Sequence, residues 1–268
     1  MTISRKGAAL VTGASAGIGA IYADRLARRG YDLILVARNR ERLETLAKRL
    51  ADDTGRVVEV APADLNDSAD LARIERLLRT RGNITMLVNY AGVGALGPLL
   101  VTEYDRIDEM ISLNVKAFTH LTAAATLGFV DRGGGRSIII ASVVGVAPEV
   151  LNGVYGATKA FVLALSLSLH KELAEKNVRV QVVLPGATAT DFWELAGQSV
   201  DHLPEEIVMN AGEMVDAALV GLDQGELVTI PSLPNLADWH AYEAARQKLI
   251  PNLSLSVPAA RYRLVAAA

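Results

Sequence analysis

Three side chains that can move or orient a proton occur close together in the middle of the sequence: Ser142, Tyr155 and Lys159. Tyr155 and Lys159 are four residues apart, a spacing that puts both on one face of a helix. A free tyrosine has a pKa of about 10, and a nearby ammonium is expected to lower that pKa by stabilising the phenolate. Tyr155 is then able to act as general acid on a carbonyl oxygen, or as base on the corresponding alcohol, while Ser142 orients that oxygen by a hydrogen bond.

A fourth polar side chain, Asn114, lies in an apolar stretch with Ile111, Leu113 and Val115. A buried amide needs hydrogen-bond partners. We expect Asn114 to bend the helix that carries it and to hold a water molecule beside Lys159. The spacing Tyr-x-x-x-Lys is common on helix surfaces, so the interpretation depends on its occurrence together with serine and asparagine.

A glycine-rich turn, TGASAGIG over residues 12–19, follows a short apolar segment and opens an amphipathic one. This context is typical of dinucleotide binding. Gly13 permits a tight turn, while Gly17 and Gly19 let the backbone approach a pyrophosphate and let the helix pack on the strand. The first N–H groups of the helix would face the phosphates. Beside the proton-transfer residues, such a turn predicts hydride transfer at a carbonyl or alcohol carbon. A turn without a ligand is the alternative.

The end of the second predicted strand indicates which dinucleotide binds. In this architecture an acidic residue about 20 positions past the turn suits NAD, and an arginine suits the 2′-phosphate of NADP. This chain has Arg38 there and no acidic residue between Val36 and Arg38. We therefore predict NADP (NADPH) as the cofactor, with NAD less favoured. A solvated basic start to a helix is the other interpretation of Arg38.

Further along, three short segments follow predicted strands. Asp64 can accept a hydrogen bond from an adenine amino group or cap the next helix, although Asp67 is the better candidate for the cap. The small residues Ala91 and Gly92 would let a cofactor lie against the backbone. Thr188 is suited to hold a nicotinamide amide, or it belongs to a plain turn.

Apolar patterning predicts alternating strands and helices. The predicted strands are 8–11, 32–37, 56–61, 86–89, 137–141, 178–184 and 227–230, and the predicted helices are 17–29, 40–50, 68–79, 103–130, 155–176, 213–222 and 237–249. Such alternation predicts an α/β fold, a doubly wound sheet of seven parallel strands with helices on both faces. We expect one domain over residues 1–268, with an irregular substrate lid at 189–212 and a C-terminal extension at 231–268.

Composition narrows the function further. The net charge is −3 and no basic stripe occurs, which argues against nucleic-acid binding. The chain has no cysteine, and its four histidines are scattered, so we expect neither a disulfide nor a metal site. No apolar run approaches the roughly 20 residues that cross a membrane. The N-terminus only faintly resembles a secretory signal, and we expect a cytoplasmic protein without membrane contact.

These motifs resemble the short-chain dehydrogenase/reductase family over about residues 6–227. The resemblance implies a single-domain Rossmann fold and a catalytic tetrad of Asn114, Ser142, Tyr155 and Lys159. It also implies that the lysine contacts the nicotinamide ribose, and that the protein forms a homotetramer or homodimer through its two long helices. The residues expected at the cofactor are Gly13, Ser15, Gly17, Ile18, Gly19, Arg38, Asp64, Leu65, Asn89, Ala91, Gly92, Tyr155, Lys159, Pro185, Gly186 and Thr188.

Two residues depart from the family's usual pattern. Tyr90 stands where the Asn-Asn-Ala-Gly signature has its second asparagine, and it is expected to disturb local packing without touching the chemistry. Ala16 stands where many NADP-dependent members have a basic residue, which leaves Arg38 to carry the cofactor prediction.

The substrate pocket is expected to be apolar with one polar end, which suits a hydrophobic ketone, aldehyde or secondary alcohol. Its predicted wall residues are Leu96, Val144, Val146, Leu151, Val154, Phe192, Trp193, Leu195 and Met209. No Lys or Arg occurs between Arg179 and Arg246, so substrates carried on coenzyme A or on a carrier protein are disfavoured. The favoured function is an NADP-dependent carbonyl reductase. An NAD-dependent secondary alcohol dehydrogenase and a catalytically silent NADP-binding sensor or scaffold are the alternatives.

Overall fold

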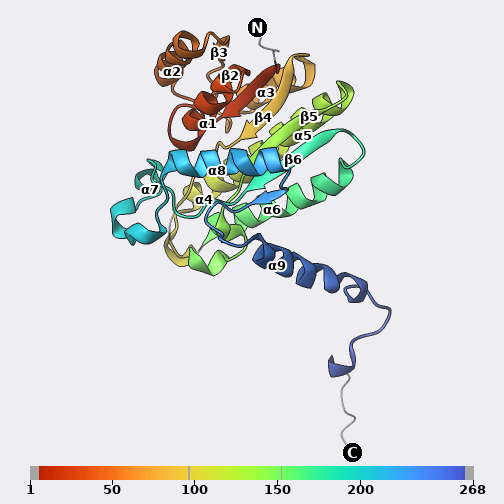
Figure 1. The fold of residues 1–268 in the computed structure, drawn as a ribbon. Coiled ribbons are helices and arrows are strands. Elements are labelled where there is room, and N and C mark those ends of the chain that lie inside the picture. The colour runs from red at the N-terminus through yellow and green to blue at the C-terminus, as the bar shows by residue number, and fades with distance from the viewer. Residues whose placement is uncertain (1–5, 96, 152, 263–268) are drawn as a thin grey trace, which may run out of the picture. The chain divides into compact units, whose positions relative to one another are not determined.

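The computed structural model describes residues 6–95, 97–151 and 153–262, and the chain forms two compact units, Met1–Ser232 and Leu233–Ala268. In the first unit seven parallel strands form one sheet in the order β3-β2-β1-β4-β5-β6-β7 (Figure 1). The strands are β1 (Ala8–Thr12), β2 (Asp32–Val36), β3 (Val58–Val60), β4 (Ile84–Asn89), β5 (Gly135–Ile140), β6 (Val178–Val183) and β7 (Val228–Thr229).

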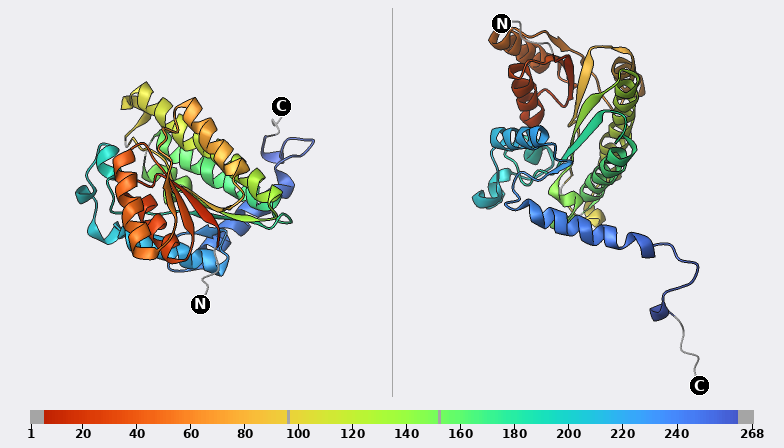
Figure 2. Two further views of the ribbon diagram at one scale, coloured as in Figure 1. Left: turned by 90° about the horizontal axis from the view of Figure 1, so that it is seen from above. Right: turned by 45° about the vertical axis from the view of Figure 1, so that its right-hand side comes forward.

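Helices cover both faces of this sheet (Figure 2). Helices α1, α2 and α8 lie on one face, and α3, α5 and α6 lie on the other. The doubly wound α/β fold predicted from the sequence is therefore confirmed. The helices of the first unit are α1 (Gly17–Arg28), α2 (Arg40–Thr54), α3 (Ser68–Thr80), α4 (Tyr104–Ile111), α5 (Phe118–Asp131), α6 (Val154–Glu172), α7 (Phe192–Leu195) and α8 (Ala211–Gln224).

The central strands are apolar along their whole length because the sheet is buried on both faces. All five residues of β1 are buried, and β1 lies between β2 and β4, with Leu10 paired to Ile34 on one side and Leu87 on the other. The chain leaves β1 towards β2 and later returns to the other side of β1 as β4. That reversal of strand order opens a crevice beyond the carboxyl ends of β1 and β4, where ligands bind in open α/β sheets.

Helix starts differ in how their free N–H groups are satisfied. Asp67 accepts hydrogen bonds from the backbone N–H groups of Ala69 and Asp70 at the start of α3, as predicted. Asn39 caps α2 in the same way. By contrast Ala16, at the start of α1, supplies no capping side chain, and the first turn of α1 holds no acidic residue. The donors at that terminus are therefore available to a ligand.

The helix predicted over residues 103–130 forms a continuous helical stretch, but not an α-helix throughout. It is divided into α4, a π-helical segment (Ser112–Ala117) and α5. The wider segment contains Asn114, whose side chain leaves the helix to bond the chain at Val93. Single π-type turns often occur where a side chain must be redirected at a functional site.

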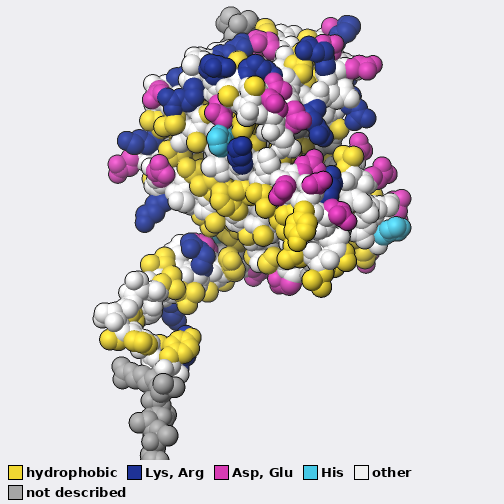
Figure 3. Space-filling view, turned by 180° about the vertical axis from the view of Figure 1, so that it is seen from behind, with side chains coloured by type: hydrophobic (Ala, Val, Ile, Leu, Met, Phe, Trp, Pro, Cys, Tyr) yellow, Lys and Arg dark blue, Asp and Glu magenta, His cyan; other side chains and the backbone are white. Residues whose placement is uncertain are grey.

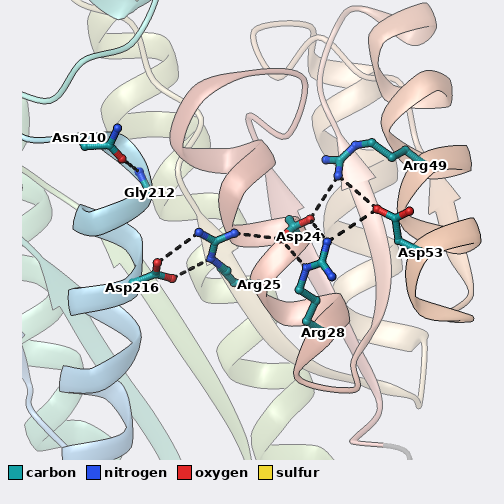
Figure 4. Close-up of polar contacts among 8 residues, drawn as sticks. All are labelled: Asp24, Arg25, Arg28, Arg49, Asp53, Asn210, Gly212 and Asp216. Carbon is teal, nitrogen blue, oxygen red and sulfur yellow. Dashed lines mark hydrogen bonds and ion pairs between the residues drawn. The ribbon is translucent and has the colours of Figure 1, made fainter.

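An ion-pair network joins α1, α2 and α8 (Figure 4). Arg25 donates two hydrogen bonds to Asp216 of α8. Asp24 accepts from Arg25, Arg28 and Arg49. Burial opposes ionisation of Asp24, but these hydrogen bonds prevail and lower its pKa. The network fixes α8 against the helix that begins at the glycine-rich turn.

The second unit consists of α9 (Leu236–Lys248) followed by short turns. Within α9 the rings of Trp239 and Tyr242 lie 5.2 Å apart. In the described residues of both units, no helix is long and apolar enough to span a membrane, and no cluster of His, Asp and Glu is suited to hold a metal ion.

Candidate active site

A cavity of about 300 Å³ lies beside the glycine-rich turn, where β1, β2 and β4 end. Eight of the residues predicted to contact the cofactor line it: Gly13, Ser15, Gly17, Arg38, Asp64, Leu65, Ala91 and Gly92. The other eight do not line it: Ile18, Gly19, Asn89, Tyr155, Lys159, Pro185, Gly186 and Thr188. The cavity thus gathers the residues predicted for the adenosine and pyrophosphate end and stops short of the predicted catalytic residues.

The glycine-rich turn needs its glycines for two separate reasons. Gly13 has a φ of +68°, a conformation that L side chains rarely adopt. A Cβ atom on Gly19 would collide with the carbonyl oxygen of Gly13, so the first turn of α1 packs directly on the turn before it. This close packing brings the uncapped start of α1 to the cavity, which suits an anionic group such as a pyrophosphate.

Two guanidinium groups stand at the end of β2. Arg38 and Arg42 both line the cavity, and neither side chain forms a hydrogen bond or ion pair with any residue that the structure describes. Arg40, between them, is paired with Glu44. The two cations beside the cavity suit a phosphate on the adenosine ribose.

Asn89 is a predicted cofactor residue whose side chain is bonded within the protein and does not line this cavity. Its side chain accepts a hydrogen bond from Thr12 at 3.2 Å and donates to Thr122 and to the carbonyl oxygen of Phe118. Asn89 thereby connects β1, β4 and α5 inside the buried layer. The amide stabilises the contacts among these elements, and both of its hydrogens are already used.

Tyr155 lies in the first turn of α6, and Lys159 lies one turn later. The Lys159 ammonium is 5.6 Å from the centre of the Tyr155 ring and donates a hydrogen bond to the carbonyl oxygen of Ile140 at the end of β5. Burial lowers the pKa of Lys159 to about 8. The expected lowering of the Tyr155 pKa is not met in this structure, because burial raises it.

Ser142 and Asn114 approach from other elements. The Ser142 hydroxyl donates a long hydrogen bond of 3.4 Å to the carbonyl oxygen of Pro185 and accepts an equally long one from the N–H of Val144. The Asn114 amide accepts from the N–H of Val93 at 2.9 Å, and it donates to the carbonyl oxygen of Val93 and to Thr158. Both amide hydrogens of Asn114 are therefore used in bonds within the protein. If a water lies beside Lys159 as expected, a group of the π-helical segment other than this amide must hold it.

The predicted lid covers the tyrosine. Helix α7, which the sequence pattern missed, carries Phe192, whose ring centre lies 5.5 Å from that of Tyr155. Tyr155 is consequently only 8% exposed. The indole N–H of Trp193 donates to the carbonyl oxygen of Thr188. The Thr188 hydroxyl donates to the carbonyl oxygen of Gly186. The bond from Trp193 thus joins the segment after β6 to the predicted lid.

The pocket wall predicted for the substrate is partly assembled. Val144, Leu151, Val154 and Phe192 form one apolar cluster with Tyr155, which also includes Met110, Val93, Ala95, Ile107 and Val143. Met209 packs instead in the main core, and Leu96 lies outside the described residues.

Phe192 and Leu195, predicted as walls of the substrate pocket, also line this cavity. Several other cavity residues were missed from the sequence: Ala16, Val36, Ala37, Asn39, Arg42, Ala63, Asn66, Tyr90, Val93, Leu113, Thr190 and Asp191. A signal existed for Tyr90, because it interrupts a recognisable signature, and for Thr190 and Asp191, because they directly follow a predicted cofactor segment. Leu113 gave no such signal, since it reads as an ordinary apolar helix residue.

The chain was compared with known proteins. The profile of the short chain dehydrogenase family matches residues 7–200. A short-chain dehydrogenase from Sphingobium yanoikuyae, solved in complex with NADPH, is 49% identical with a TM-score of 0.93, covering 96% of this chain and 100% of that one. The bulky-bulky ketone specific alcohol dehydrogenase from Comamonas testosteroni is 44% identical with a TM-score of 0.88, covering 96% and 98%.

A curated relative is named for a different substrate. The very-long-chain 3-oxoacyl-CoA reductase from Anas platyrhynchos is 33% identical over 207 residues, which are 76% of this chain and 66% of the duck protein. The family profile covers most of the chain, and the fold agrees with that of the solved relatives. The glycine-rich turn lies at the carboxyl ends of β1 and β4. This protein belongs to the short-chain dehydrogenase family and is an NAD(P)-dependent oxidoreductase acting on CH–OH groups.

Proposed function

We propose that the protein is an NADPH-dependent reductase of hydrophobic ketones that carry bulky groups on both sides of the carbonyl. NADP(H) as the cofactor is supported by the NADPH in the Sphingobium structure and by the two unpaired guanidinium groups at the end of β2. The uncapped start of α1 fits the pyrophosphate. The ketone class is supported by the printed specificity of the Comamonas enzyme and by the apolar cluster around Tyr155.

One observation carries the proposal: a buried lysine stands one helical turn from a buried tyrosine, beside the dinucleotide cavity. Lys159 is 7% exposed and Tyr155 is 8% exposed. Burying an ammonium is costly unless it has partners, and Lys159 has only one hydrogen-bond acceptor among the described residues. A phenolate formed at Tyr155 would supply the missing counter-charge, so the pair is suited to proton transfer.

The proposed mechanism assigns one task to each residue. NADPH held by the residues of this cavity would supply the hydride that reduces the carbonyl carbon. Tyr155 donates its hydroxyl proton to the carbonyl oxygen, and the Lys159 ammonium stabilises the phenolate that remains. Ser142, whose hydroxyl is loosely held, turns to donate a hydrogen bond to the same oxygen. Asn114 holds the π-helical segment against Val93 and Thr158. The product is the alcohol.

Acyl-CoA substrates have less support despite the duck relative. The lid carries no Lys or Arg. Arg106, which reaches the lid from α4, is already paired with Glu109 and bonded to two carbonyl oxygens. A phosphate-rich coenzyme would want a free cation at the pocket mouth. These substrates therefore serve as a comparison in the test.

The test follows NADPH consumption with aryl alkyl and diaryl ketones, with small ketones and with a 3-oxoacyl-CoA, and with NADH in parallel. We expect turnover on the bulky ketones with NADPH. Tyr155→Phe should lower turnover by at least a thousandfold because it removes the proton donor, while its NADPH affinity stays within a few-fold. Substantial activity in Tyr155→Phe would contradict the mechanism.

The cofactor preference is tested in the same assay with Arg38→Asp. We expect this variant to lose NADPH affinity by more than tenfold, since the carboxylate repels the 2′-phosphate, and to lose little NADH affinity. An equal loss for both cofactors would refute the role of Arg38. Turnover with NADH alone would favour the NAD-dependent alcohol dehydrogenase. Tight NADPH binding without turnover in either direction would favour the silent sensor.

We further propose that the protein assembles through α5 and α6 as a homodimer or homotetramer, and that it acts on small molecules and not on nucleic acid. A cytoplasmic location stays a prediction. Support for assembly comes from the part of α6 between Ala157 and Ser168, where the exposed residues Ala157, Phe161, Ala164 and Ser168 carry no charge. Hydrophobic side chains gather on the face of the molecule that carries these helices (Figure 3).

A further inference from the structure

Tyr90, the residue that departs from the family signature, lies directly under the glycine-rich turn. A Cβ atom on Gly13 would lie 2.8 Å from the Cδ1 atom of Tyr90, and one on Gly19 would lie 3.0 Å from the same atom. The Tyr90 hydroxyl lies further along the turn, 3.7 Å from the corresponding position on Gly17. The ring therefore supports the turn from Gly13 to Gly17, and its polar end emerges at the uncapped start of α1.

The hydroxyl of Tyr90 is not used within the described part of the protein. It forms no hydrogen bond with any described residue, although Tyr90 lines the cavity together with Ser15, Gly17 and Thr190. Burial, assisted by the nearby charge of Asp191, raises the pKa of Tyr90 to about 12. The hydroxyl thus keeps its proton at physiological pH and is available as a donor. Tyr90 is half-buried and lines the cavity, so its unpaired donor can reach an acceptor on a ligand bound there.

We propose that the Tyr90 hydroxyl donates a hydrogen bond to the pyrophosphate of the bound dinucleotide. Tyr90 would thereby join the backbone N–H groups of α1 as a ligand-binding group, beyond its packing role. The inference rests on the proposed dinucleotide site but not on the choice of NADPH, because NADH has the same pyrophosphate. Thr190, whose Cγ2 lies 3.4 Å from a Cβ built on Gly17, lies at the same point.

An anion is the acceptor that best fits the surroundings. The first turn of α1 has no acidic residue and no capping side chain, so its N–H groups are open to a ligand in the cavity that Tyr90 also lines. Asp191 is the competing acceptor, because it lines the same cavity and carries a negative charge. No hydrogen bond joins Tyr90 to Asp191 in the residues described, and the experiment separates the two acceptors.

The experiment compares the wild type with Tyr90→Phe, which removes the hydroxyl and keeps the ring. Equilibrium titrations measure the affinities for NADPH, NADH and 2′-AMP, which carries the adenosine phosphate but no pyrophosphate. We expect Tyr90→Phe to weaken NADPH and NADH about tenfold, as expected for a lost hydrogen bond to a charged group, and to leave 2′-AMP unchanged. The melting temperature without ligand should not change. Tyr104→Phe, at an 84% exposed tyrosine, is the control and should alter none of these values.

Three outcomes would overturn the proposal. Unchanged affinity for both dinucleotides would show that the hydroxyl makes no bond to the ligand. Equal losses for all three ligands, or a lower melting temperature, would assign Tyr90 a purely structural role in the turn. A loss that disappears in the Asp191→Asn background would assign the hydroxyl to that carboxylate. A wild type that prefers NADH would refute only the cofactor choice, since the NADH comparison still tests Tyr90.

Discussion

At the scale of single residues, the site contains a charge that the fold does not stabilise. Lys159 has its pKa lowered by burial from the usual 10.5 to about 8. Its partners are the carbonyl oxygen of Ile140 and the face of the Tyr155 ring. A lowered pKa means that the folded protein binds the lysine proton less tightly than the unfolded chain does, so the ammonium reduces stability. Functional sites commonly carry such a cost.

The sign of this effect gives a prediction for Lys159→Met. The penalty is fully present below pH 8 and disappears as the pH rises from about 8 to 10.5, where both states lose the proton. The free energy of unfolding of the variant, relative to the wild type, should therefore fall by about 3 kcal/mol between pH 7 and pH 10.5. Chemical denaturation across this range measures it.

A control variant separates burial from charge. Lys48 pairs with Asp52 on the surface of α2, and Lys48→Met should give no stability gain at pH 7. If the difference between Lys159→Met and the wild type did not change with pH, Lys159 would have an ordinary pKa in the folded protein.

The residues best predicted from the sequence are those whose role depends on their immediate neighbours. Asp67 was identified as a helix cap because the cap is made within three residues along the chain. The pKa of Tyr155 was predicted in the wrong direction, since burial raises it, and residues distant in the sequence such as Met110 and Phe192 contribute to that burial. Asn89 was predicted at the cofactor, but its amide is taken up by α5.

At the scale of elements, continuous apolar strands were easy to predict because a parallel sheet buries both faces. Two elements were not predicted. The π-helical segment at Ser112–Ala117 has the composition of an ordinary helix, and it forms where Asn114 bonds Val93 on another element. Helix α7 (Phe192–Leu195) is short, and it depends on packing against the site more than on its own propensity.

Helix α7 is fastened to the body by Arg106. The guanidinium donates to the carbonyl oxygens of Gly94 at 3.2 Å and Leu195 at 3.3 Å, and it pairs with Glu109. These bonds join α4, the loop after β4 and the lid. Since Phe192 covers Tyr155 in this arrangement, we expect substrate entry to require movement of α7, which the hydrogen bonds of Arg106 oppose.

We therefore predict that Arg106→Ala raises the population of the open lid. Backbone amide hydrogens of residues 195–198 should exchange roughly tenfold faster, because two carbonyl hydrogen bonds are lost, while the strands of the sheet keep their protection. Hydrogen exchange followed by mass spectrometry measures this. Arg40→Ala, which removes a surface pair with Glu44, is the control. Unchanged exchange in the lid would show that Phe192 packing alone holds it closed.

At the scale of the whole molecule, the most telling surface is the helical face opposite α1 and α8. Between Ala157 and Ser168 the exposed positions of α6 follow a helical spacing and are all uncharged: Ala157, Phe161, Ala164 and Ser168. On α5, Leu127 is 50% exposed. Large apolar patches that face solvent usually mark protein–protein contacts. Small side chains around one phenylalanine would let two copies of the helix approach closely.

The corresponding prediction concerns the oligomeric state. Phe161→Glu places a charge in the middle of this face and should shift the protein from an assembly to a monomer, as light scattering behind size exclusion measures. Val220→Glu is the matched control, since Val220 is also exposed and apolar but lies on α8, across the sheet. Circular dichroism verifies that each variant is folded, and Phe161→Ala tests the contact without adding charge. A wild type that is monomeric at micromolar concentration, or a folded Phe161→Glu that keeps its assembly, would contradict assembly through α6.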